Sequence, residues 1–385
     1  MKIIYVCGGD VSVFESQVLE LLKFLHQHDI SVVLLQGYSS EKEKQNISRK
    51  IANYEYIDIV WAKSYPVYPI FTNQAIKSYY NGLKTIPEWQ DAILHIRSEY
   101  DGYIFCQMVE RYKLSNKILI DFRALVYEEL SYKIKHHSSV KRRILNLIQH
   151  SFYGSFYRKL FNCDNENLAI TSVSPEINRY IRQNYPYCKL HLSVRPNIAG
   201  NLMKYSSERR IEIRTELGLT DNDVVAVCST GGGAMWQRDR DVVRTLLDCG
   251  LKIINLSKSP IEMSNCINMF VPFSKVPDYL SAADAAVLWR ENTFMNQSAS
   301  PSKLSEFATM GLYIIHNGTV KIAEEYIRQS GAGVIFENTE DIGPNLIEKI
   351  KAQDRDANCI SGINMFGVDA IGNSYITEYK RLSKL

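Results

Sequence analysis

The sequence lacks the features typical of membrane-spanning, disulfide-bonded or nucleic-acid-binding proteins. No apolar run among its 385 residues approaches the length of about 20 that a membrane-spanning helix needs, and MKIIYVCGG begins with a strand pattern instead of a signal peptide. The eight cysteines stand without the close pairs of zinc or redox sites. A net charge of +3 gives no overall signal for nucleic acid. We therefore expect a cytoplasmic protein with reduced thiols and no nucleic-acid partner.

The alternation of short apolar runs with helical patterns predicts an α/β protein. A chain of this length exceeds what one hydrophobic core usually serves, so we expect two domains. The runs that read as strands share β-branched and aromatic composition and buried-strand length. In the first half they are expected at 3–7, 31–35, 58–62, 102–106 and 118–122, then from 168 to the helix start at 174–176 and from 190 to the turn at 195–197. In the second half they are expected at 224–229, 252–256, 267–271, 285–289, 312–316 and 333–336.

The most informative stretch runs from Arg290 to Asn317 and combines a base, a helix start and a carboxylate. Arg290 follows a buried strand, and Ser300-Pro301-Ser302 predicts a helix with Ser300 as its cap and Pro301 at its first position. Lys303 lies in the first turn, where a cation is unfavourable unless an anion binds nearby. Glu306 follows, and Gly311 ends the helix. The free amides of such a helix start bind phosphate, so the stretch predicts a nucleotide diphosphate site.

This stretch resembles the nucleotide-sugar motif of bacterial family 4 retaining glycosyltransferases. The matching residues are Arg290, Asn296, Ser300-Pro301-Ser302-Lys303, Glu306-Phe307 and Gly311. The resemblance implies that Glu306 binds the ribose hydroxyls, and that Arg290, Lys303 and the helix start hold the pyrophosphate. The family usually carries another glutamate, and Ser298 occupies its position here. Each residue taken singly is also compatible with an ordinary exposed helix.

The resemblance implies the GT-B architecture, in which two Rossmann-like domains face each other across a cleft. It places an acceptor-binding domain at 1–200 and a nucleotide-sugar-binding domain at 201–365. The helix at 366–385 is expected to cross back onto the first domain. The implied reaction moves a sugar from a nucleotide-diphosphate sugar to a hydroxyl of a glycan or lipid-linked acceptor. It is expected to retain anomeric configuration, to need no metal or other cofactor, and to serve bacterial surface polysaccharide synthesis.

A glycine turn after the first strand of the second domain is the other expected phosphate contact. Gly231, Gly232 and Gly233 allow backbone amides to approach a phosphate closely, and Gln237 and Arg238 follow them. A tight turn without ligand explains the glycines equally well. The nearby Asp239-Arg240-Asp241 has the spacing of a metal-binding pair, but acidic residues that open a helix are the better explanation.

The first domain offers polar residues at two expected strand ends. Gly8, Gly9 and Asp10 follow the first strand without the third glycine of a dinucleotide motif, so we expect a donor or acceptor contact or a plain turn there. Asp121 and Arg123 end another strand. The family resemblance implies that Asp121 faces the reacting sugar, and a buried ion pair is the alternative.

The segment 133–161 holds seven basic and no acidic residues, with apolar residues at helical spacing. Such a helix can bind an anionic membrane surface, here the inner face of the cell membrane. The alternative is a helix whose apolar stripe packs on the sheet.

Two other functions are compatible with this sequence. A nucleotide-sugar epimerase on the same fold would isomerise the donor without an acceptor. An inactive scaffold subunit of a polysaccharide assembly complex would bind no nucleotide, and Ser298 in place of the usual glutamate favours it.

Overall fold

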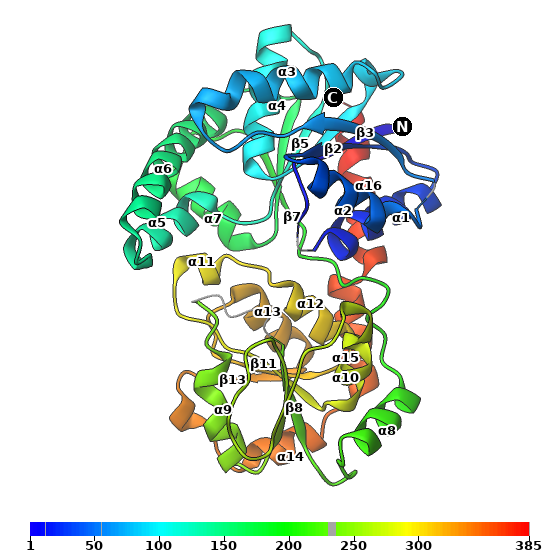
Figure 1. The fold of residues 1–385 in the computed structure, drawn as a ribbon, viewed down its shortest axis with the longest axis vertical. Coiled ribbons are helices and arrows are strands. Elements are labelled where there is room, and N and C mark those ends of the chain that lie inside the picture. The colour runs from blue at the N-terminus through cyan, green and yellow to red at the C-terminus, as the bar shows by residue number, and fades with distance from the viewer. Residues whose placement is uncertain (12, 55, 230–235, 385) are drawn as a thin grey trace. The chain divides into compact units, whose positions relative to one another are not determined.

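The computed structural model describes residues 1–11, 13–54, 56–229 and 236–384. The chain forms two compact units. The first unit comprises Met1–Pro196 and Gly372–Leu385, and the second unit comprises Asn197–Ile371. Each unit contains one parallel sheet flanked by helices (Figure 1). The predicted α/β class with two parallel sheets is confirmed.

The first unit is built on a seven-stranded sheet in the order β3-β2-β1-β4-β5-β6-β7. Its strands are β1 (Lys2–Cys7), β2 (Ser31–Tyr38), β3 (Asp58–Lys63), β4 (Ile93–Arg97), β5 (Ile118–Phe122), β6 (Leu168–Ser172) and β7 (His191–Val194). The chain leaves β1 towards β2 on one side and later returns to add β4 on the other. The strand order therefore reverses between β1 and β4, and ligands of parallel sheets bind beyond the strand ends at such a point.

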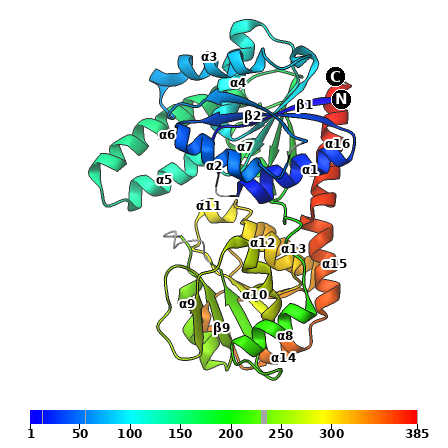
Figure 2. The same cartoon turned by 45° about the vertical axis from the view of Figure 1, so that its right-hand side comes forward.

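Helices cover both faces of this sheet. They are η1 (Glu15–Leu19), α1 (Glu20–Gln27), α2 (Glu41–Ile51), η2 (Pro69–Phe71), α3 (Thr72–Leu83), η3 (Trp89–Asp91), α4 (Glu99–Tyr112), α5 (Val126–His136), α6 (Val140–Phe161), α7 (Pro175–Asn184) and the last helix, α16 (Val368–Ser383). Gly102 of α4 packs on Ile120, so α4 covers one face. The opposite face carries α16, because Tyr379 bonds to His95 of β4 (2.6 Å). The expected return of the last helix to the first domain is confirmed (Figure 2).

The strand expected at 102–106 is wrong. These residues lie in α4. The strand that pairs with β1 is β4, which begins nine residues before the predicted strand. The letters GYIFC are apolar and aromatic, but Gly102, Ile104 and Phe105 are buried on one side of a helix that begins at the Ser98 cap. A short apolar run does not distinguish a strand from a buried helix. The Ser98 cap favours the helix here.

The second unit contains a six-stranded sheet in the order β10-β9-β8-β11-β12-β13. Its strands are β8 (Val225–Cys228), β9 (Lys252–Leu256), β10 (Cys266–Met269), β11 (Ala285–Leu288), β12 (Tyr313–His316) and β13 (Gly333–Ile335). Its helices are α8 (Ser207–Glu216), α9 (Asp239–Asp248), η4 (Phe273–Lys275), α10 (Val276–Ala282), α11 (Phe294–Gln297), α12 (Ser302–Thr309), α13 (Lys321–Ser330), η5 (Thr339–Asp341), α14 (Asn345–Lys351) and α15 (Arg355–Phe366). The order reverses between β8 and β11, as it does between β1 and β4.

The basic segment 133–161 forms the end of α5 and the whole of α6, with a break at 137–139. The two helices lie side by side in the first unit (Figures 1 and 2). Phe156 is buried against the core, while the first two turns of α6 expose Val140, Ile144 and Leu147. Among the described residues, no helix is long and apolar enough to cross a membrane.

Candidate functional site

The candidate nucleotide site of the second unit lies at the carboxyl edge of its sheet, where β11 leads into α12. β11 is the strand next to β8, so its end lies beside the point where the strand order reverses. Arg290 follows β11 by two residues, and Ser302, Lys303 and Glu306 lie in α12. Parallel α/β sheets bind their ligands at this edge.

Arg290 is held by its backbone, and among the described residues its side chain forms no ion pair, although the Asp239 carboxylate acts on its charge. Asn317 donates to the Arg290 carbonyl oxygen (2.6 Å), and Thr319 donates to the same oxygen (3.3 Å). The side chain is only 7% exposed, and its Nε has no hydrogen-bond partner within the described part of the chain. Burial lowers the pKa of the Arg290 guanidinium, and the Asp239 carboxylate offsets part of that effect. A buried guanidinium whose N–H groups are not all hydrogen-bonded can bind an anion.

The residues after the glycine turn pair with the end of β11. Gln237 and Arg290 form an antiparallel bridge, and the Arg238 amide donates to the Trp289 carbonyl oxygen (3.0 Å). Asp239 opens α9 and accepts a hydrogen bond from the Trp289 amide (2.7 Å). Burial raises the pKa of Asp239 to about 6, although Arg290 acts in the opposite direction. The structure therefore brings Gln237 and Arg238 to Arg290, and Asp239 has the helix-opening position that we expected.

Lys303 and Glu306 form an ion pair on α12. Their Nζ and Oε2 atoms are 2.7 Å apart, and the Glu306 side chain is only 6% exposed. The spacing of three residues brings the two side chains together on one face of the helix. Lys303 thus has a carboxylate partner in Glu306, and the phosphate that its position in the first turn predicts stays a prediction. A bound ligand would compete for both groups.

The helix start differs by one residue from the prediction. We expected Ser300 as the cap and Pro301 as the first helical residue, but Pro301 is the cap and α12 begins at Ser302. The Ser300 hydroxyl instead accepts a hydrogen bond from the Asn197 amide (3.2 Å). Pro301 has extended backbone angles, and a residue at the cap position adopts such angles.

Asn296 and Ser298 hold the loop between β11 and α12. The Asn296 side chain is buried and donates to the Glu291 carbonyl oxygen (2.8 Å). The Ser298 hydroxyl donates to the Met295 carbonyl oxygen (3.2 Å), and the residue is 2% exposed. Both side chains shape the loop. A role in ligand binding stays a prediction for Asn296.

The expected phosphate contacts at Gly231, Gly232 and Gly233 lie outside the described residues. Within the described residues, no three histidine, cysteine, aspartate or glutamate side chains are grouped so that they could hold a metal ion.

Asp121 is the centre of a buried polar network in the first unit. Arg123 donates to both of its carboxylate oxygens (3.2 and 3.1 Å), and Tyr375 of α16 donates to Oδ2 (3.2 Å). The Nε2 atom of His95 lies 3.8 Å from Oδ2. Burial opposes ionisation of Asp121, but Arg123 and His95 outweigh it and hold the pKa of Asp121 well below its usual range. The buried ion pair, one of our two alternatives for these residues, is present.

A cavity of about 380 Å³ opens at the carboxyl ends of β1 and β4, where the strand order of the first sheet reverses. Gly8 and Gly9 line it, as does Arg123. Sequence reasoning missed two further residues of its wall, Arg97 and Asp101, because it misplaced the strand that ends at Arg97. The pattern ILHIR before the Ser98 cap was the signal that could have located them.

No protein-family model matches the sequence, and no curated protein is significantly similar to it. Solved structures do match its fold over almost the whole chain. A glycosyltransferase from Rickettsia africae is 14% identical (TM-score 0.67) over 99% of this chain and 98% of its own. Sucrose-phosphate synthase from Thermosynechococcus elongatus is 13% identical (TM-score 0.65) over 99% of both chains. Anabaena Alr3699/HepE in complex with UDP-glucose is 12% identical (TM-score 0.63) over 99% of this chain and 100% of its own. The chain has the GT-B fold that these proteins share.

Proposed function

We propose that this protein is a glycosyltransferase that moves a sugar from a nucleotide-diphosphate sugar to a hydroxyl of a glycan or lipid-linked acceptor. The observation that carries the proposal is the buried Arg290 guanidinium at the carboxyl end of β11, next to the helix that bears Lys303 and Glu306. Its Nε has no hydrogen-bond partner among the described residues. The solved complex of HepE with UDP-glucose supports a nucleotide sugar as the donor.

The second unit would bind the donor. Arg290, Lys303 and the amides at the start of α12 would face the diphosphate, where negative charge grows as the glycosidic bond breaks. Glu306 would accept hydrogen bonds from the ribose hydroxyls, which requires that Lys303 turn from Glu306 towards phosphate. We further propose that the reaction retains anomeric configuration and needs no metal, because these cations would stabilise the leaving group. The product would belong to a bacterial surface polysaccharide.

The exposed start of α6 supports a membrane location for the acceptor. Lys141, Arg142 and Arg143 are exposed beside Val140 and Ile144, and no acidic residue lies between 133 and 161. We propose that these turns dock on the anionic inner face of the cell membrane, since each basic residue near such a surface contributes about 1 kcal/mol.

Nucleotide binding is the first test of the function. A thermal-shift panel of nucleotide sugars, with UDP-glucose first, should stabilise the wild type by about 2.7 kcal/mol at 100 times the dissociation constant. Glu306→Gln should weaken the binding at least tenfold. The matched control is Glu324→Gln, because Lys321 and Glu324 form the same kind of pair on α13 (2.8 Å). An unchanged affinity of Glu306→Gln would contradict the site, and absence of any nucleotide binding would favour a scaffold protein.

Vesicle binding tests the membrane location. The wild type should sediment with phosphatidylglycerol vesicles at low salt, and charge removal at Lys141, Arg142 and Arg143 should weaken this binding about 100-fold. The control removes two exposed charges elsewhere, Lys349 and Lys351, and should have little effect. Equal sedimentation of both variants would show that α6 is not the docking surface.

A further inference from the structure

The cavity of the first unit has the size and walls of a sugar site. Its volume of about 380 Å³ falls in the range of small-molecule pockets. Aromatic side chains from four different segments contribute to its wall, namely Tyr65, Tyr79, Tyr100 and Tyr153. Such rings combine a flat apolar face with a polar edge, which suits a molecule whose own faces are apolar and whose rim carries hydroxyls.

A buried positive charge lines this cavity. Arg97 is the last residue of β4 and is only 6% exposed. No carboxylate of the described residues lies within ion-pair distance of its guanidinium, and Asp121, on the neighbouring strand, is already bonded to Arg123 and Tyr375. Burial opposes the Arg97 charge, but Tyr5 and Asp121 outweigh it and raise the pKa of the guanidinium. Arg97 therefore stays charged at the cavity wall, where its N–H groups can donate to an anionic ligand.

The acidic residue of the cavity wall is partly neutralised. Asp101 accepts hydrogen bonds from the hydroxyls of Ser98 (2.8 Å) and Tyr79 (3.1 Å). Burial raises the pKa of Asp101 to about 6. Gly8 allows this approach, because a Cβ atom there would lie 2.3 Å from an Asp101 oxygen. The carboxyl is therefore tied to its neighbours and leaves Arg97 available to a ligand.

The backbone beside Arg97 is strained. Ser98 has φ 98° and ψ 152°, a region that is almost restricted to glycine. β4 ends directly before Ser98 and α4 begins directly after it. This sharp change of direction places Arg97 and Asp101 at the same cavity. Strain of this kind is concentrated at ligand sites, which is a second observation in favour of one here.

We propose that this cavity binds an acidic sugar unit of the acceptor, with its carboxylate or phosphate paired to Arg97. The inference rests on the proposed function and adds the substrate class to it. A guanidinium donates two parallel hydrogen bonds to either anion, so both groups satisfy the same chemistry. Asp101 would accept a hydrogen bond from a sugar hydroxyl. The cavity would thus select an acidic acceptor over a neutral one.

The test compares three free sugars on the full chain by ligand-observed NMR titration. D-glucuronate, D-glucose 6-phosphate and D-glucose are titrated with and without a saturating amount of the nucleotide found in the thermal-shift panel. At least one acidic sugar should bind about tenfold more tightly than D-glucose, with or without the nucleotide. Tighter binding of D-glucuronate would indicate a carboxylate ligand, and tighter binding of D-glucose 6-phosphate would indicate a phosphate ligand. Equal affinity for all three, or competition of the acidic sugar with the nucleotide, would overturn the inference.

Two variants with opposite expected effects locate the anion. Arg97→Gln should lower the affinity for the acidic sugar about tenfold and leave the nucleotide affinity unchanged. Asp101→Asn should raise the affinity for the acidic sugar, because it removes a negative charge from the cavity wall. The control is Arg111→Gln, on the exposed surface of α4. An unchanged affinity of Asp101→Asn together with an unchanged Arg97→Gln would refute the site. If nucleotides bind and acidic sugars do not, the inference fails alone; if nucleotides do not bind either, the proposed function fails.

Discussion

The two units have a buried arginine at the same topological position, but the surroundings of the two arginines differ. Arg97 ends β4, the strand added next to β1, and Arg290 follows β11, the strand added next to β8. Each lies near a carboxyl whose pKa burial raises to about 6, Asp101 in the first unit and Asp239 in the second. Two sheets of one topology therefore each place a buried arginine near the point where the strand order reverses.

The difference lies in what the neighbouring carboxyl does. Asp101 accepts hydrogen bonds from side-chain hydroxyls and lines the cavity with Arg97. Asp239 accepts the Trp289 amide and fixes the backbone next to Arg290. One carboxyl is bonded to side chains of the cavity wall, and the other is bonded to the backbone. The comparison teaches that the same strand position places a buried arginine beside a cavity in one unit and beside a helix start in the other.

The largest expected effect is that of Arg290→Gln. Loss of a charged group that stabilises the leaving diphosphate should lower kcat/KM by about 100-fold or more. Arg97→Gln should chiefly raise the acceptor KM. Steady-state kinetics with varied donor and acceptor distinguishes the two. Arg244→Gln, an exposed change on α9, is the control. If both arginine variants changed the same kinetic constant, the division of roles between the units would be wrong.

Close helix packing in the second unit gives the next effect. A Cβ atom on Gly362 would lie 2.1 Å from the Ala308 carbonyl oxygen, so Gly362→Ala must separate α15 from α12. We expect a loss of about 3 kcal/mol in unfolding free energy, together with weaker nucleotide binding, because α12 carries Lys303 and Glu306. Urea denaturation measures the first and calorimetry the second.

Gly343→Ala is the control for this variant, since a Cβ atom there meets its nearest neighbour at 3.5 Å. Equal stability of the two variants would show that α15 can move away from α12 without cost.

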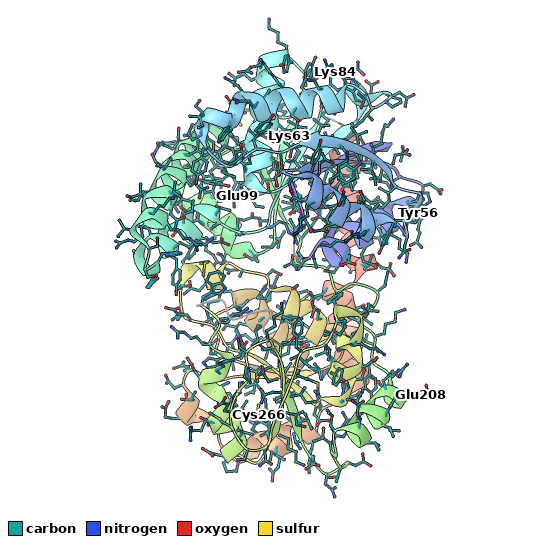
Figure 3. All side chains as sticks on the ribbon, viewed as in Figure 1. Tyr56, Lys63, Lys84, Glu99, Glu208 and Cys266 are labelled. Carbon is teal, nitrogen blue, oxygen red and sulfur yellow. The ribbon has the colours of Figure 1, made fainter. Side chains whose placement is uncertain are left out.

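One buried group in each unit, Glu99 in the first and His316 in the second, should give stability an opposite dependence on pH. Burial raises the pKa of Glu99 in the first unit from 4.5 to about 8, although Tyr157 and the Val126 amide donate to its carboxylate. Figure 3 shows Glu99 inside the first unit. The stability from this group is complete below pH 4.5 and is lost as pH rises through 8. The loss is up to about 1.4 kcal/mol per pH unit.

His316 gives the second unit the opposite dependence. Burial lowers the pKa of His316 from 6.5 to about 4, against the effect of its hydrogen bonds to Leu288 and Val320. Its stabilisation is complete above pH 6.5 and is lost as pH falls through 4. Hydrogen exchange at pH 5 and pH 8 should therefore show the first unit loosening at the higher pH. Glu99→Gln should remove that change, and a variant with the wild-type profile would contradict the assignment.

The smallest effect concerns the strained residue beside Arg97. Ser98→Gly relieves the backbone strain at a cap position where glycine costs only a few tenths of a kcal/mol, so its stability should equal or exceed that of the wild type. Ser98→Ala keeps the strain and loses the cap, which should cost about 1 kcal/mol. Thermal unfolding of the pair measures the difference. A more stable alanine variant would show that Ser98 is not strained.

The sequence predicted the second unit better than the first. In the second unit each apolar run became a strand, and the helix start at 300–302 was misplaced by only one residue. In the first unit the run at 102–106 became a helix, and its two aromatic residues pack on different neighbours, Phe105 on Tyr79 of α3 and Tyr103 on Phe152 of α6. The error hid β4, and with it Arg97 and its cavity. Composition describes a buried segment, but it does not say whether that segment is a strand or a helix.

The amino-acid sequence by itself determined the α/β alternation and the local pairing of Lys303 with Glu306. Both depend on neighbours in the chain, since helix caps and a spacing of three residues act within one or two turns. Only the tertiary structure decided that Arg123 forms the ion pair with Asp121, that Arg97 attracts the same carboxylate from the neighbouring strand, and that Tyr375 of the last helix bonds to it. These choices depend on which strands become neighbours, and strand order is set by packing across the whole sheet. The sequence thus located the candidate nucleotide site, and the fold revealed the second one.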